Sequence, residues 1–158
     1  MKKVTWIIII IIVLGFGYVF YKATSNTDSC LTAEAKDINV GGDKNVVLHI
    51  HPMLTITING EDIAIPSHIG LENGIMRPLH THDDTGEIHV ESSCVRDYTL
   101  GDFFDVWGET FTSSCIMDYC TDETHTLTVY VNGVESAQYE DLTLKDKDNI
   151  QIVYEEIT

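Results

Sequence analysis

Six of the seven histidines in this chain fall between positions 49 and 89. They are His49, His51, His68, His80, His82 and His89. Imidazole is the commonest metal ligand in proteins, and three of them suit Zn²⁺ or Cu²⁺, with a fourth position left for water. The pattern predicts a site for a copper or zinc ion, provided that the fold brings the rings together. The alternative is a set of surface histidines that only form hydrogen bonds.

Three of these histidines lie on the two arms of a predicted β-hairpin. Polar and apolar side chains alternate along residues 79–82 and 87–91, and residues 83–86 between them are typical of a turn. If the turn leaves an even number of residues unpaired, His80 lies opposite His89 and His82 lies opposite Glu87. All four side chains then share one face, with opposed Cβ atoms about 4.5 to 5.5 Å apart.

We therefore predict His80, His82 and His89 as metal ligands, with Glu87 as a nearby carboxylate. The other face of the hairpin, which we expect to pack on the core, holds Leu79, Thr81, Ile88 and Val90. This inference depends on the turn, because an odd number of unpaired residues would shear the opposed pairs out of register.

His49 and His51 are the second candidate pair. They share one face of a predicted strand, with Leu48 and Ile50 on the other face. They could complete the same metal site or form another one. His68 lies in a predicted loop and His125 stands alone before a later strand, so we expect structural roles for these two.

The N-terminus predicts a membrane anchor over residues 1–22. Lys2 and Lys3 precede an uncharged apolar run from Val4 to Tyr21, and eighteen helical residues span about 27 Å, close to the hydrocarbon core of a bilayer. Lysines on this flank favour a cytoplasmic N-terminus, so the rest of the chain is expected outside, in the periplasm or the extracellular space. A cleaved signal peptide is the alternative, because small residues follow at positions 23–25.

After the anchor, residues 23–44 are predicted to form a polar tether, and residues 45–158 one exported domain. The chain carries 25 acidic and 9 basic residues, a formal net charge of −16. Three of those basic residues lie within the anchor, so the exported part is more acidic still. Such a surface would repel nucleic acid and anionic lipid headgroups, which argues against nucleic acid as a partner.

Four cysteines in an exported chain are expected to form disulfides. Cys115 and Cys120 enclose four residues, a loop short enough for a local bridge. Cys94 would then pair with Cys30 or remain free. The functional alternative is that Cys115 and Cys120 are thiolate metal ligands or a redox pair.

The alternation of side chains predicts an α+β fold that is mostly β. Strands are expected at residues 54–58 and 63–65, around the histidine hairpin, and at 127–131 and 150–154. One short helix is expected over residues 99–108, capped by Thr99 and Asp102 and ended by Gly108. The last strands, with Asn132-Gly133 and an Asp-rich turn, resemble the closing part of β-grasp domains. The alternative is a β-sandwich or cupin-like fold.

Two groups of motifs resemble those of known families. Gly74, His80, His82 and Glu87 match the first half of the cupin metal motif, but Cys94 stands where cupins have glycine and no second motif follows. The segments HIHPMLTITING (49–60), LHTHDDTGEIHVE (79–91) and YTLGDFFDVWG (98–108) resemble an uncharacterised, widespread family of exported, often membrane-anchored prokaryotic proteins. That resemblance implies export and a shared fold but supplies no activity.

The sequence therefore favours a membrane-anchored extracytoplasmic protein that captures, buffers or delivers copper or zinc, with a membrane enzyme or complex as the receiving partner. The first alternative is an accessory subunit of a membrane complex, in which the histidines only stabilise the fold. The second is a metal-dependent hydrolase or lyase, with Glu87 or Glu91 as a base. No nucleophile signature and no cofactor loop stands out, so we expect a binding protein rather than an enzyme.

Overall fold

The computed structural model describes residues 11–15, 18, 30–41 and 46–157. The chain divides into two units, Met1–Ala33 and Glu34–Thr158. In the first unit residues 11–15 are helical, and most of the predicted anchor lies outside the described residues. Within the described part of the chain, no helix is long and apolar enough to cross a membrane.

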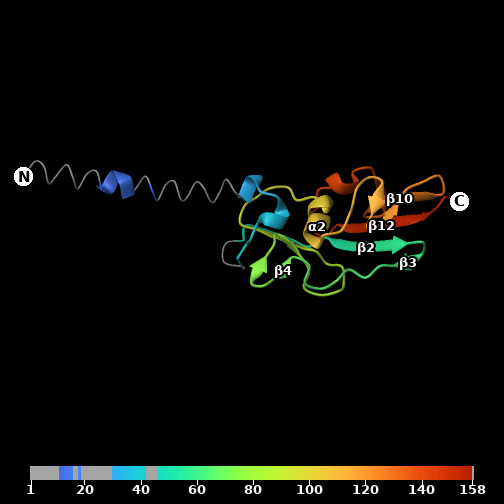
Figure 1. Ribbon diagram of the computed structural model, residues 1–158, viewed down its shortest axis with the longest axis horizontal. Helices are drawn as coiled ribbons and strands as arrows, with labels where there is room; N and C mark the ends of the chain where they lie inside the picture. The colour runs from blue at the N-terminus through green and yellow to red at the C-terminus, as the bar shows by residue number, and fades with distance from the viewer. Residues whose placement is uncertain (1–10, 16–17, 19–29, 42–45, 158) are drawn as a thin grey trace, which may run out of the picture. The chain divides into compact units, whose positions relative to one another are not determined.

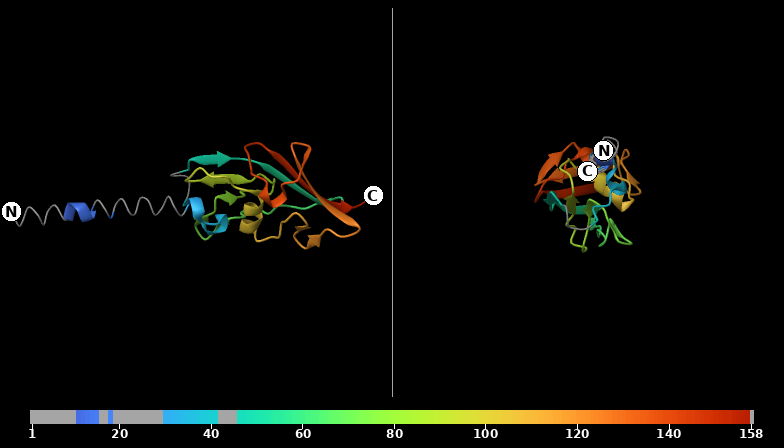
Figure 2. Two further views of the ribbon diagram at one scale, coloured as in Figure 1. Left: turned by 90° about the horizontal axis from the view of Figure 1, so that it is seen from above. Right: turned by 90° about the vertical axis from the view of Figure 1, so that its left-hand side faces the viewer.

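The second unit is built on a five-stranded mixed sheet. Its strands are β2 (Met53–Ile58), β3 (Glu61–Asp62), β10 (His125–Val131), β11 (Val134–Ser136) and β12 (Asn149–Glu156), in the order β11-β10-β12-β2-β3. The last strand, β12, runs parallel to β2, and the two lie side by side (Figure 1; Figure 2). Alternate residues of β12 are buried, which explains why its sequence alternates between apolar and polar side chains.

Two tight turns set the register of the sheet edges. Asn59-Gly60 joins β2 to β3 and Asn132-Gly133 joins β10 to β11, and all four residues have positive φ, as a type I′ turn requires. The first turn is shorter than the sequence predicted. Its two residues bring Glu61 opposite Ile58, so β3 occupies residues 61 and 62 rather than 63–65.

A three-stranded antiparallel sheet carries three of the histidines, His49, His80 and His89. It consists of β1 (Leu48–Ile50), β7 (His89–Ser92) and β6 (Leu79–His80), with β7 in the middle. Between β1 and β2, His51 and the buried Pro52 carry the chain from this sheet to the larger one. Two short hairpins complete the strands: β4 (Leu71–Glu72) pairs with β5 (Ile75–Met76), and β8 (Cys115–Ile116) pairs with β9 (Tyr119–Cys120).

The predicted short helix is confirmed as α2 (Leu100–Trp107). The Thr99 hydroxyl accepts from the Asp102 amide while the Asp102 carboxylate accepts from the Thr99 amide, and Gly108 ends the helix in the left-handed conformation. Phe103 and Phe104 of this helix are buried in the core. Two 3-10 helices flank it, η1 (Ala35–Asp37) and η3 (Tyr139–Asp141).

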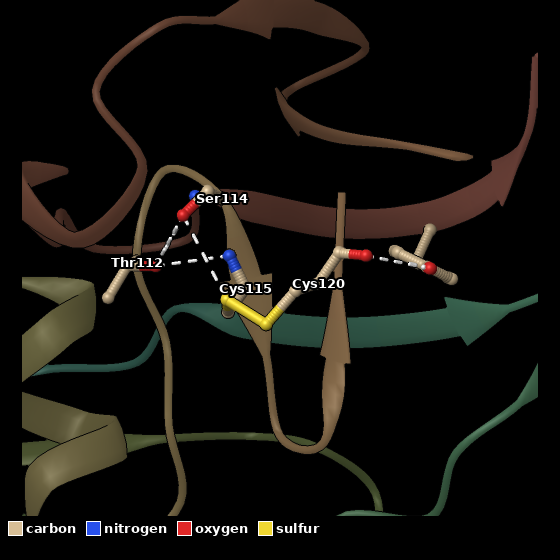
Figure 3. Close-up of a disulfide and its surroundings, with 5 residues drawn as sticks. Thr112, Ser114, Cys115 and Cys120 are labelled. Atoms are coloured by element: carbon tan, nitrogen blue, oxygen red, sulfur yellow. Dashed lines mark hydrogen bonds between the residues drawn. A yellow bond between two sulfur atoms is a disulfide. The ribbon is translucent and has the colours of Figure 1, made fainter. Parts of the chain in front are cut away.

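The predicted local disulfide between Cys115 and Cys120 is present and links β8 to β9 (Figure 3). The Thr112 hydroxyl accepts a 3.0 Å hydrogen bond from the Cys115 amide, and the Tyr154 hydroxyl donates to the Cys120 carbonyl. Cys30 and Cys94 are also disulfide-bonded. The bridged Cys115 and Cys120 offer no thiolate to a metal, so that part of the functional alternative is wrong for this oxidised chain, while a redox role for the pair stays a prediction.

The domain is small and mostly β, as predicted, and it begins before residue 45. Residues 34–41, which the sequence pattern placed in the tether, belong to the second unit, where Ala35 is 1% exposed and the Val40 amide donates to the Met76 carbonyl. The small apolar side chain of Ala35 packs in the core and accounts for the place of this segment in the domain. The cupin-like alternative is not supported, because jelly rolls are antiparallel throughout whereas β12 and β2 are parallel.

Candidate metal centre

The register predicted for the centre of the histidine hairpin is confirmed. His80 of β6 lies opposite His89 of β7, and Leu79 lies opposite Val90. The side chains expected on the core face, Leu79, Thr81, Ile88 and Val90, are all buried. The rings of His80 and His89 are stacked, with centroids 5.5 Å apart and an interplanar angle of 19°.

The predicted pairing of His82 with Glu87 is wrong. The strand pairing ends at His80, because the backbone of Thr81 instead exchanges hydrogen bonds with His68 and Ile69. Glu87 forms an isolated bridge with Met53. Thr81 and Glu87 thus pair with other segments, so the hairpin is open at the position where the sequence predicts a tight turn.

His82 nevertheless lies within the cluster. Its ring centroid lies 4.4 Å from that of His89 and 4.9 Å from that of His80, and the rings meet edge-on in both cases. The loop after it is held by Asp83, whose carboxylate accepts from the amide and the hydroxyl of Thr85, and these bonds hold the pKa of Asp83 below its usual value. The loop then packs on β2 through a 2.9 Å hydrogen bond from the Leu54 amide to the Gly86 carbonyl.

His80 is the best defined candidate ligand. It is 0% exposed, and its Nδ1 lies 3.0 Å from the Arg77 carbonyl oxygen. A carbonyl only accepts, so Nδ1 carries the proton and Nε2 keeps a lone pair. Burial lowers the pKa of His80, which favours the neutral ring. Among the described residues, the buried Nε2 has no hydrogen-bond partner.

His89 lies at the centre of the cluster, between two carboxylates. Its Nε2 is 3.2 Å from Oε1 of Glu87, and its Nδ1 is 3.9 Å from Oε1 of Glu91. The pKa of His89 is lowered, first by burial and then by the neighbouring His82 and His51, against the opposing effect of the two glutamates. Its Nδ1 is buried and lacks a hydrogen-bond partner in the described part of the chain.

The second pair, His49 and His51, reaches the same centre from β1 and the residue that follows it. Their ring centroids are 4.5 Å apart, and the ring centroid of His51 is 4.7 Å from that of His89. Nε2 of His49 lies 3.0 Å from Oε1 of the buried Glu91, its partner in the β1–β7 pairing. The backbone amide of His51 donates to Asp146, which fixes this residue against the turn before β12.

These five histidines form two groups of three with His89 in common. Within each group, one ring nitrogen per residue lies within 4.8 Å of the others: His80, His82 and His89 in one group, and His49, His51 and His89 in the other. Ligand bonds of about 2.0 to 2.1 Å require nitrogens no more than about 4.2 Å apart, so small ring rotations would complete either group. Nδ1 of His80 already bonds to a backbone carbonyl, the arrangement that orients metal-bound histidines.

The remaining candidate positions lie outside the two groups of three. Glu87 contacts His89 but lies beside the rings rather than within either group of three. His68 is exposed in a turn. His125 hydrogen-bonds to Asp122 and stacks on Tyr154, away from the cluster. Hydrogen bonds from Thr124 first, and then those from His125, hold the pKa of Asp122 at about 2.

Two acidic residues were not predicted as neighbours of particular histidines. The sequence offers Glu91 only as a catalytic base and gives Asp146 no role, whereas Glu91 lies 3.0 Å from His49 and Asp146 lies 3.9 Å from His51. The signal for Glu91 was its place two residues after His89, which puts both side chains on one face of β7. No local signal marks Asp146, because it approaches from a loop 95 residues away in the chain.

Comparison of the chain with protein-family models, with curated proteins and with solved structures gives no match. The resemblance to exported prokaryotic proteins therefore stays a prediction, and the function is argued from the cluster itself.

Proposed function

We propose that this protein is a membrane-anchored extracytoplasmic binding protein for copper or zinc, which captures, buffers or delivers the ion. One observation carries the proposal: the buried Nε2 of His80 holds a lone pair without a hydrogen-bond partner among the described residues, while Nδ1 is fixed on Arg77. A buried polar group left unsatisfied costs about 1 to 3 kcal/mol. A metal ion coordinated by His80, His82 and His89 would remove that cost.

The ligand types favour Zn²⁺ or Cu²⁺. Imidazole suits both ions, whereas the soft thiolates that favour Cu(I) are excluded at the cysteines, which are disulfide-bonded. His82 is exposed, so the group opens toward solvent on one side. A three-histidine group with an open side can accept an ion and release it to another protein, as a carrier must.

The cellular setting is part of the proposal. The apolar N-terminal run supports an anchor with its N-terminus in the cytoplasm, and the oxidised cysteines fit an oxidising compartment outside the membrane. The parallel pairing of β2 with β12, flanked by hairpin partners on both sides, supports a β-grasp-like arrangement for the larger sheet. An exported carrier of this kind would have a membrane enzyme or complex as its receiving partner.

The enzyme alternative has less support. A metal-dependent hydrolase or lyase would use Glu87 or Glu91 as a base, but both carboxylates already lie against histidine rings, at 3.2 Å and 3.0 Å. The accessory-subunit alternative predicts a folded protein that purifies without metal. A single measurement of metal content therefore separates it from the proposal.

The test is elemental analysis of the full chain, purified in detergent after expression in medium containing copper and zinc. We expect stoichiometric metal in the wild-type protein and a loss of at least half in the His82→Ala variant, which changes an exposed side chain. His68→Ala, which changes another exposed histidine outside the cluster, is the matched control and should retain all of its metal. Wild-type protein that is folded but free of metal, or a His82→Ala variant with unchanged metal, would contradict the proposal.

A further inference from the structure

We propose that the cluster holds two metal ions and that the imidazole ring of His89 bridges them. One ion would be bound by His80 and His82, the other by His49 and His51, and each by one nitrogen of His89. The inference rests on the proposed function and adds to it a second binding position and a fixed stoichiometry.

The first support is that the five rings do not form one shell. In the described part of the chain, ring contacts join His49 to His51 and His80 to His82, and both pairs contact His89. No ring contact within that part joins one pair to the other. The two groups of three share only His89, so a single ion could not use all five histidines.

The second support is the environment of His89. Its two nitrogens face different carboxylates, Nε2 toward Glu87 at 3.2 Å and Nδ1 toward Glu91 at 3.9 Å. Negative charge therefore lies near both edges of the ring, and each edge is a favourable place for a cation. A histidine that binds a single ion needs only one nitrogen for it and commonly uses the other as a hydrogen-bond donor.

The proton balance of this arrangement is simple. Neutral His89 carries one N–H and one lone pair, so the first ion takes the lone pair and the second replaces the proton. Loading two divalent ions thus releases one proton from His89 to solvent and leaves a bridging imidazolate. Glu87, Glu91 and Asp146 supply negative charge that offsets the two ions.

The bridge also separates this site from two-metal hydrolases. Two ions bound at about 2.0 to 2.1 Å from opposite nitrogens of one ring stand about 6 Å apart. Catalytic metal pairs stand about 3.5 to 4 Å apart, so that one substrate oxygen can touch both. Two ions at the wider spacing suit storage or transfer of metal.

The experiment is a titration of metal-free full-length protein with Cu²⁺, followed by electron paramagnetic resonance (EPR) on the same samples. We expect two ions per chain in the wild type, with less EPR signal than the bound copper accounts for, because an imidazolate bridge couples the two spins. His82→Ala and the double variant His49→Ala/His51→Ala remove one position each. Each should bind one ion with full signal.

Three outcomes would overturn the two-ion site: one ion per wild-type chain, two ions with full uncoupled signal, or two ions retained in both half-site variants. Wild-type protein that binds no copper would instead overturn the proposed function. His125→Ala, which removes a histidine outside the cluster, controls for adventitious copper on surface histidines and should still bind two ions with the reduced signal. Loss of an ion in that variant would count against the assignment.

Discussion

Replacement of Gly86 by alanine should destabilise the domain and weaken metal binding together. Gly86 has a φ of +85°, and a Cβ built on it would lie 2.3 Å from the carbonyl oxygen of Leu54. That oxygen cannot move away easily, because Leu54 is buried and pairs with Ile150 in the middle of the larger sheet. The loop that carries His82 and Glu87 must move instead.

The size of the effect follows from two contributions. A left-handed conformation costs a residue with a Cβ about 1 to 2 kcal/mol. Displacing the loop also breaks the hydrogen bond from the Leu54 amide to the Gly86 carbonyl, worth about 0.5 to 1.5 kcal/mol. We expect a loss of about 2 to 3 kcal/mol in the free energy of unfolding. Because the loop holds His82, the affinity for the first ion should fall as well.

Gly133→Ala is the matched control. Gly133 has a similar φ of +80°, but a Cβ there would meet nothing within 4 Å. This control should show the conformational cost alone, about 1 to 2 kcal/mol, with unchanged metal affinity. The assay is urea unfolding of the metal-free protein, followed by tryptophan fluorescence, together with a metal titration of each variant. Equal destabilisation by the two substitutions, or full metal affinity in Gly86→Ala, would refute the reasoning.

Three further predictions follow from the described contacts. The pKa of His80 is lower in the folded chain than its ordinary value near 6.5, so the metal-free protein should lose stability as the pH falls below about 6.5. His80→Asn should flatten the pH dependence of urea unfolding between pH 7 and 5. An unchanged slope would count against this role of His80. Replacing Cys115 and Cys120 by serine should cost about 2 kcal/mol of stability and leave the metal content unchanged, whereas loss of metal in elemental analysis would link the hairpin to the site. Thr99→Ala, which removes the side-chain cap on the Asp102 amide, should cost about 1 kcal/mol in the same unfolding assay; no loss would mean that the cap contributes nothing.

The part of the site that depends on local chain geometry could be predicted from the sequence. An even count of residues between His80 and His89 is enough to place them opposite each other once the turn is assumed. The capping residues Thr99 and Asp102 and the stop at Gly108 likewise act over a few positions, and α2 follows them closely.

The part that depends on competition between distant segments could not be predicted. Thr81 pairs with residues 68 and 69, and Glu87 with Met53, so the hairpin opens although its own sequence favours closure. The position of His49 and His51 beside His89 similarly requires β1 to pair with β7 across about forty residues, and Asp146 arrives from still further along the chain. Periodicity shows which residues share a face but not which strand will be the neighbour.

The parallel pairing of β2 with β12 has a consequence for the order of events during synthesis. Thr55 of β2 contacts Ile150 of β12, a residue that leaves the ribosome 95 positions later. The larger sheet, and with it the anchorage of His51 on Asp146, therefore cannot form until β12 has been synthesised. If the chain is threaded through the membrane before it folds, an ion bound at the proposed site would be selected by the compartment of arrival and not by the metal pool of the cytosol.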